Sequence, residues 1–105
     1  MANVKILSEA KKYFNNDGCY LLIKHVFDMD ENVLHICISV EKNDTTWFAR
    51  THSVKPEYCD RSQIVFRVLV SDMLCLNKDS LFLAEHLADK CERMINNSLN
   101  NDTNK

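Results

Sequence analysis

Residues 33–41 carry an aliphatic side chain at every second position, and this period of two constrains the fold more than any other feature. Successive side chains of a β-strand point to opposite faces, so the segment predicts a strand with one buried face. Residues 19–28 are also rich in β-branched and aromatic side chains, and the polar residues 28–32 separate the two segments. We therefore expect these segments to form an antiparallel hairpin.

The register of this hairpin follows from its apolar side chains. If Phe27 lies opposite Leu34, the aliphatic side chains of both strands share one face, and a slip of one residue would expose them. The same alignment places His25 and His35 on opposite faces of the sheet. Two further aligned pairs follow, Ile23 with Ile38 and Leu21 with Val40.

Both ends of the chain have the spacing of an amphipathic helix. Residues 3–15 repeat apolar side chains at intervals of three and four, and Gly18, the only glycine, follows where a left-handed residue would end a helix. Residues 80–97 repeat the pattern after polar residues 77–80 that can cap a helix. The stripe at the N-terminal end is Val4, Leu7, Lys11 and Phe14, and the stripe at the C-terminal end is Leu83, Leu87, Cys91 and Met94.

Residues 62–76 fit two structures. Their β-branched side chains favour a strand, whereas the intervals between Val65, Leu69 and Met73 fit a buried helix. We predict a strand over residues 62–71 and keep the helix as the alternative.

The predicted fold class is α+β. An N-terminal helix precedes an antiparallel sheet of about four strands, and a C-terminal helix packs on the sheet. Residues 1–99 form a single domain, and residues 100–105 form a polar, flexible tail. The order of helix, strands and helix resembles that of type III secretion chaperones, and this resemblance implies a dimer that binds another protein.

Composition excludes several classes of function. The net charge of −2 gives no strong attraction to nucleic acid or to an anionic membrane. One glycine is too few for a Rossmann fingerprint or a P-loop. We expect a cytoplasmic protein with no membrane partner, because no basic start with an apolar run marks a secretory signal. The five cysteines are odd in number and contain no Cys-x-x-Cys pair, so we expect them to be reduced.

Two groups of reactive side chains are candidates for a metal site or a catalytic site. The candidate metal ligands are histidines and a cysteine that are scattered along the sequence. The close ligand spacings that metal sites usually have are absent, so we expect no metal and no cofactor. A Cys59–His52 nucleophile is the enzymatic alternative, but no glycine-rich loop accompanies it to form an oxyanion hole. We therefore expect no enzymatic activity. The candidate metal ligands are His25, His35, Cys37 and His52, if neighbouring strands bring them together.

A nucleic-acid-associated regulator is a second alternative. Double-stranded RNA-binding domains also run helix, three strands, helix, with a basic cluster at the start of the last helix. In this chain only Lys78 is basic there and Asp79 follows it, which departs from the pattern. Basic and aromatic side chains gather at Lys5, Lys11, Lys12 and Tyr13, and again at Trp47, Arg50 and His52.

Residues 45–54 are the predicted strand with the fewest aliphatic side chains, and Pro56 follows them. Proline ends a strand's pairing, so we expect an exposed edge here. Trp, Tyr and Arg dominate binding energies at protein interfaces. The expected partner-binding residues are Trp47, Phe48, Arg50 and Tyr58, and the alternative is that Trp47 and Phe48 complete the core.

These features favour a small non-enzymatic module that binds a protein partner. An inhibitor, an immunity protein, an antagonist or a chaperone-type protein acts in this way. The Asn- and Lys-rich composition is typical of a bacterium or a phage. The sequence is also compatible with a homodimer.

Overall fold

The computed structural model describes residues 3–14 and 18–103, with side chains as far as residue 97. The strands come first and the helices follow, so the fold is α+β. A short 3₁₀ helix, η1, joins the sheet to the helices. The elements are β1 (Val4–Phe14), β2 (Cys19–Asp28), β3 (Val33–Lys42), β4 (Thr45–Val54), η1 (Pro56–Tyr58), α1 (Cys59–Cys75) and α2 (Ser80–Thr103).

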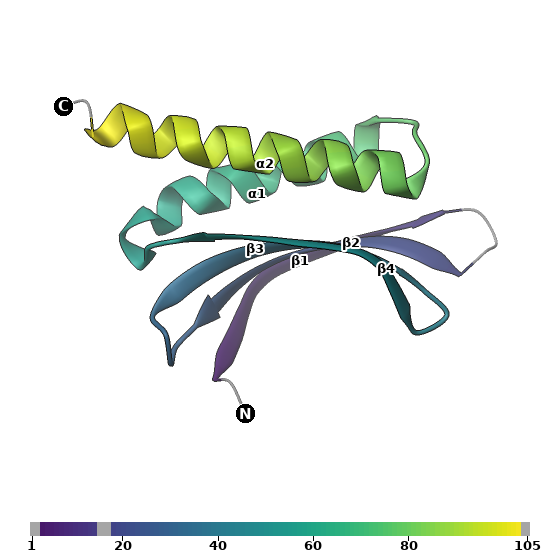
Figure 1. Ribbon diagram of the computed structural model, residues 1–105, viewed down its shortest axis with the longest axis horizontal. Coiled ribbons are helices and arrows are strands. Elements are labelled where there is room, and N and C mark those ends of the chain that lie inside the picture. Colours follow the sequence, from purple (N-terminus) through teal and green to yellow (C-terminus); the bar gives the residue numbers. More distant parts are fainter. Residues whose placement is uncertain (1–2, 15–17, 104–105) are drawn as a thin grey trace.

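The four strands form one antiparallel sheet in the order β1-β2-β3-β4. The register of the β2–β3 hairpin is the predicted one, since Phe27 pairs with Leu34 and Ile23 with Ile38. Asn43 and Asp44 connect β3 to β4 with φ angles of 49° and 63°. Two left-handed residues give a tight turn whose twist matches that of the flanking strands. Figure 1 shows both helices over one face of the sheet, which bends away from them at its ends.

The core fills the space between this face and the helices. Alternate side chains of β2 and β3 point into it, and Ile23, Ile36 and Ile38 are fully buried. β3 is an inner strand, so its aliphatic residues meet the helices while the residues between them face away. The helices contribute a matching set of buried side chains, Leu69 and Met73 from α1 and Leu83 and Leu87 from α2.

The prediction of an N-terminal helix is wrong, because residues 4–14 form strand β1. β1 pairs with β2, and its register shifts between Ile6 and Ser8. Such a bulge adds one residue to a strand. Leu7 and Ala10 therefore both pack against the core although they are three residues apart. An interval of three residues between apolar side chains is also typical of a helix, and this explains the wrong prediction. Gly18 has a left-handed φ of 70°, as predicted, but in the β1–β2 connection, whose residues 15–17 lie outside the described part of the chain.

The predicted strand over residues 62–71 is also wrong, because these residues lie within helix α1. The alternative was the correct one. Val65, Leu69 and Met73 are buried along one side of α1. Packing of this stripe on the sheet outweighs the β propensity of the segment, which is a weaker effect. Strands therefore precede both helices. This order differs from the order helix, strands, helix of type III secretion chaperones and of double-stranded RNA-binding domains.

Helix α2 begins at the predicted position. The Asp79 carboxylate accepts a hydrogen bond of 2.9 Å from the Phe82 backbone N–H, which caps the helix. Leu83, Leu87 and Cys91 are buried along the predicted stripe. The helix continues to Thr103 rather than ending at residue 97.

Candidate functional site

Strand β4 lies at one edge of the sheet, as the sequence predicts for residues 45–54. The outer edge of such a strand carries backbone N–H and C=O groups that a further strand can bind. Most side chains of β4 are exposed on both faces. Arg50 is the only Lys, Arg, Asp or Glu residue between positions 45 and 54.

The opposite edge, β1, is protected in ways that β4 is not. Charged residues and bulges hinder the addition of another strand at a sheet edge. The register shift of β1 lies within the strand, between Ile6 and Ser8. The shift of β4 lies near its first residues, so that residues 48–54 pair with β3 in continuous register. The charged residues of β1 are Lys5, Glu9, Lys11 and Lys12.

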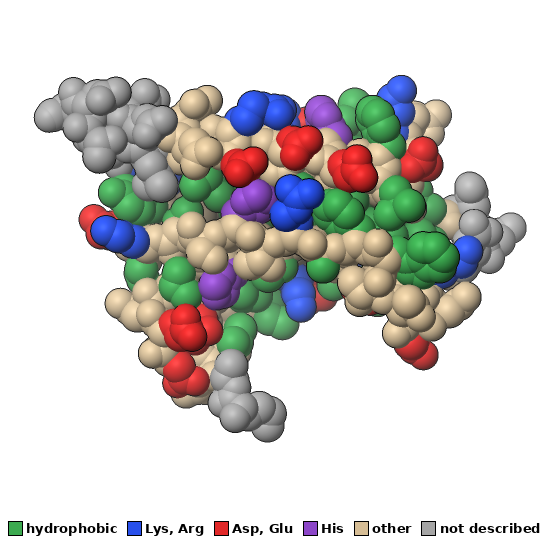
Figure 2. Space-filling view, in the orientation of Figure 1, with side chains coloured by type: hydrophobic (Ala, Val, Ile, Leu, Met, Phe, Trp, Pro, Cys, Tyr) green, Lys and Arg blue, Asp and Glu red, His purple; other side chains and the backbone are tan. Residues whose placement is uncertain are grey.

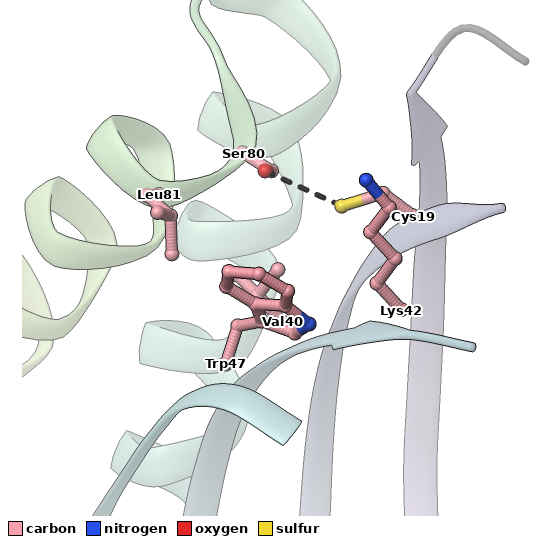
Figure 3. Close-up of a pocket in the computed structure, with 6 residues that line it drawn as sticks. All are labelled: Cys19, Val40, Lys42, Trp47, Ser80 and Leu81. Atoms are coloured by element: carbon pink, nitrogen blue, oxygen red, sulfur yellow. Dashed lines mark hydrogen bonds between the residues drawn. The ribbon is translucent and has the colours of Figure 1, made fainter. Parts of the chain in front are cut away.

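Trp47 lies just before this regular stretch, at the register shift, and 61% of it is exposed. It lines a hollow of about 180 Å³ between the sheet and the start of α2. Figure 3 shows the indole ring of Trp47 below Leu81 of α2, with Lys42 on its other side. The Lys42 Nζ atom lies 6.0 Å from the centroid of the indole ring. The thiol of Cys19 donates a hydrogen bond of 3.4 Å to the Ser80 hydroxyl at the rim. The hollow is lined by residues of β2, β3 and α2, and Trp47 is the one lining residue from β4.

Phe48 and Arg50 follow on the same strand. Phe48 is half-buried and packs against the core, whereas Trp47 does not complete the core. The Arg50 guanidinium lies 5.5 Å from the centroid of the Phe48 ring. It also lies 4.0 Å from the Asp89 carboxylate of α2, and both side chains are largely exposed. An exposed ion pair of this length contributes little to stability, so Arg50 can change partner.

An acidic stripe on α2 runs beside this edge. Glu85, Asp89 and Glu92 are exposed and lie four and three residues apart, which places them on one side of the helix. Figure 2 shows carboxylates in a row on α2, above the strand that faces the viewer. We call these three residues the acidic flank. The acidic flank was not predicted from the sequence. The spacing of its three residues can be read from the sequence, but their position beside β4 cannot.

His52 lies between the edge and the acidic flank. Its pKa is lowered, chiefly by burial and further by Arg50, while Glu92, Asp89 and a backbone hydrogen bond to Ala88 oppose the shift. The imidazole is therefore neutral at pH 7. Its Nε2 atom is buried without a hydrogen-bond partner among the described residues. Because His52 is uncharged, Arg50 is the cation of β4 that faces the acidic flank.

Tyr58 lies apart from the other three predicted binding residues. It belongs to η1, beyond the end of β4. A strand rises about 3.3 Å per residue, so the seven steps from Trp47 to Val54 span roughly 23 Å. Arg61 places its guanidinium 5.5 Å from the centroid of the Tyr58 ring. The structure thus brings Trp47, Phe48 and Arg50 together and leaves Tyr58 at the far end.

The candidate metal ligands are divided between the faces of the sheet. His25 is buried under the helices, where its Nε2 atom lies 2.8 Å from the Ser62 hydroxyl. His35 lies on the other face, where its Nδ1 atom is 2.7 Å from the Ser53 hydroxyl. Within residues 3–14 and 18–97, no three His, Cys, Asp or Glu side chains form a group that could hold a metal ion.

Cys59 and His52 are not joined by a hydrogen bond in the part of the chain that the structure describes. Cys59 instead lines a second hollow with Leu7 and Phe27, and its carbonyl accepts a hydrogen bond of 2.9 Å from Ser62. His52 faces α2. All five cysteines of the chain carry free thiols.

Two of the three basic residues of β1, Lys11 and Lys12, make contacts within the molecule. Lys12 Nζ donates hydrogen bonds of 2.9 Å and 3.1 Å to the carbonyls of Met73 and Leu76 at the end of α1. A cation favours this end of a helix. Lys11 Nζ lies 4.9 Å from the centroid of the Tyr20 ring. These contacts have a structural role, and they do not require a phosphate.

The chain matches no family model, and no curated protein or solved structure matches it significantly. Neither of the two helices, as far as the structure describes them, is long and apolar enough to cross a membrane.

Proposed function

We propose that this chain is a non-enzymatic protein-binding module that takes an extended segment of its partner as a fifth strand beside β4. The observation that carries this proposal is the regular and nearly uncharged edge of β4, next to the exposed Trp47. Main-chain hydrogen bonds along the edge supply affinity, and side-chain hollows supply specificity. Inhibitors, immunity proteins, antagonists and chaperones can all act through such a contact.

Trp47 serves as the anchor of this interface. A large aromatic side chain that is exposed in the free protein and covered in the complex contributes strongly to binding. The hollow that it lines receives one side chain of the added strand. Arg50 lies three residues further along the edge, where its side chain stays beside Asp89 of α2.

The test uses a partner captured from native-host lysate and identified by mass spectrometry. Its affinity is then measured against Trp47→Ala and against the control Tyr13→Ala, since Tyr13 is 66% exposed on the opposite edge. Loss of a binding anchor of about 2 kcal/mol weakens affinity about 30-fold. We expect this loss for Trp47→Ala alone, with both variants folded by circular dichroism. Equal affinities of the two variants would contradict the proposal.

A further inference from the structure

We propose that the added strand is basic, with Lys or Arg side chains that face the acidic flank of α2. This inference rests on the proposed function and specifies the chemistry of the partner. It is based on the position of Glu85, Asp89 and Glu92 on α2, beside the edge of β4 with which the added strand would pair.

The acidic flank reaches the edge of the sheet. Asp89 lies 4.0 Å from Arg50 of β4, and Glu92 is close enough to His52 of the same strand to oppose the lowering of its pKa. Arg50 and His52 belong to the helix-facing side of β4, because they pair with the buried Ile38 and Ile36. A fifth strand would lie about 4.8 Å beyond β4. Every second side chain of that strand would then point toward the acidic flank.

The acidic flank has more negative charge than its surroundings neutralise. Arg50 lies 4.0 Å from Asp89, and Arg93, four residues after Asp89 on α2, has no ion pair with a carboxylate of the described residues. Among the side chains that the structure describes, no cation lies within 4.0 Å of the carboxylate of Glu85 or Glu92. Lys90, on the other side of α2, is paired with Asp72 of α1. A partner with Lys or Arg at alternate positions would supply the missing charges.

A second copy of this chain is a poorer occupant of the same edge. Antiparallel pairing of two β4 edges would bring the two α2 helices close together across the dimer axis. Three carboxylates from each copy would then face one another, with one Arg50 from each copy to offset them. Like charges in register destabilise such a contact. The phosphates of a nucleic acid would meet the same repulsion.

The probes are three labelled twelve-residue peptides with threonine at every second position. The positions between the threonines are all lysine in the first peptide, all glutamine in the second and all glutamate in the third. Affinity is measured by fluorescence anisotropy at low ionic strength. Each exposed charge pair contributes about 0.5 kcal/mol, so three pairs favour the lysine peptide over the glutamine peptide about tenfold. We expect the glutamate peptide to bind more weakly than both, and added salt to remove the difference.

A triple charge reversal of the acidic flank (Glu85→Lys, Asp89→Lys and Glu92→Lys) is compared with a matched control. The control reverses three exposed carboxylates that lie outside β4 and the acidic flank, and it changes the net charge equally, at Glu9, Glu31 and Glu57. The flank variant should prefer the glutamate peptide, and the control should keep the lysine preference.

Four outcomes overturn the inference, and backbone amide chemical shifts of residues 48–54 separate the first two. If all three peptides bind equally and shift these amides, strand addition stands and the basic partner is wrong. If none of the peptides shifts them, the proposed function fails as well. A dimer of the free protein that buries β4, or tighter binding of single-stranded oligonucleotides than of the lysine peptide, would also overturn the inference.

Discussion

Replacing His25 by leucine should remove part of the acid sensitivity of the fold while leaving its stability at neutral pH nearly unchanged. His25 is fully buried, and its ring is stacked on Phe66 with centroids 6.1 Å apart. Its Nε2 atom bonds the Ser62 hydroxyl, and its Nδ1 atom has no partner among the described residues. In His25→Leu the Ser62 hydroxyl still donates to the Cys59 carbonyl, so no new polar group is left unsatisfied.

The pH effect follows from the direction of the shift. Burial lowers the pKa of His25 below 6.5, its value in an unfolded chain. The unfolded state therefore binds more protons, and stability falls as pH drops from about 6.5 toward the pKa of the folded state. Above about pH 6.5 the imidazole is neutral in both the folded and the unfolded state, so His25 adds no pH dependence to the free energy of unfolding. At pH 5.5 the loss reaches at most about 1.4 kcal/mol for one histidine, because the unfolded form is then mostly protonated.

Urea denaturation of the wild type, His25→Leu and His35→Gln at pH 7.5 and pH 5.5 measures this effect. His35 lies on the other face, so His35→Gln serves as the control. The wild type and the control should lose stability between the two pH values. The loss should be smaller in His25→Leu by up to about 1.4 kcal/mol. The reasoning is refuted if His25→Leu and the control lose the same amount, or if His25→Leu is unfolded at pH 7.5.

Three further predictions concern the core and the edge. Leu87→Ala should lower the free energy of unfolding by about 2–5 kcal/mol in urea denaturation, because Leu87 is fully buried beneath α2. Trp47→Ala should change that free energy by less than about 1 kcal/mol, since most of the ring is exposed, whereas Phe48→Ala should cost more. Thiol titration should find Cys75 reactive in the native protein and Cys91 unreactive, because Cys75 is exposed and burial raises the pKa of Cys91 to about 12. Five reactive thiols should appear after denaturation without reductant.

The elements that the sequence predicted correctly are those whose local pattern agrees with their environment. β3 is an inner strand with one covered face, so its side chains alternate and its register with β2 could be predicted. α2 rests on the sheet along one stripe and has a capping residue at Asp79, which defines its start. In β3 the apolar side chains recur every two residues, as in a strand, and in α2 they recur every three or four residues, as in a helix.

The errors arose where pairing or packing outweighs the local pattern. β1 lies at an edge and contains a bulge, so the intervals between its apolar residues resemble those of a helix. α1 has strand-like β-branched residues, but packing buries Val65, Leu69 and Met73 along one side. Long-range contacts of this kind are not encoded in a window of neighbouring residues.

The candidate site was predicted in part. The exposed strand and its three residues Trp47, Phe48 and Arg50 could be located because residues 45–54 have few aliphatic side chains and precede Pro56. The acidic flank could not be located, since its place beside β4 depends on how α2 crosses the sheet. Tyr58 is close to β4 in sequence but follows the end of the strand, which separates it from Trp47.

Amide hydrogen exchange of the protein with and without its captured partner tests the central claim most directly. Half of the amides in β4 point to the free edge, and a strand that pairs with them would slow their exchange. We predict that the partner protects alternate amides within residues 48–54 and leaves the edge amides of β1 unchanged. Protection confined to β1, to the helices or to the open face of the sheet would contradict strand addition at β4.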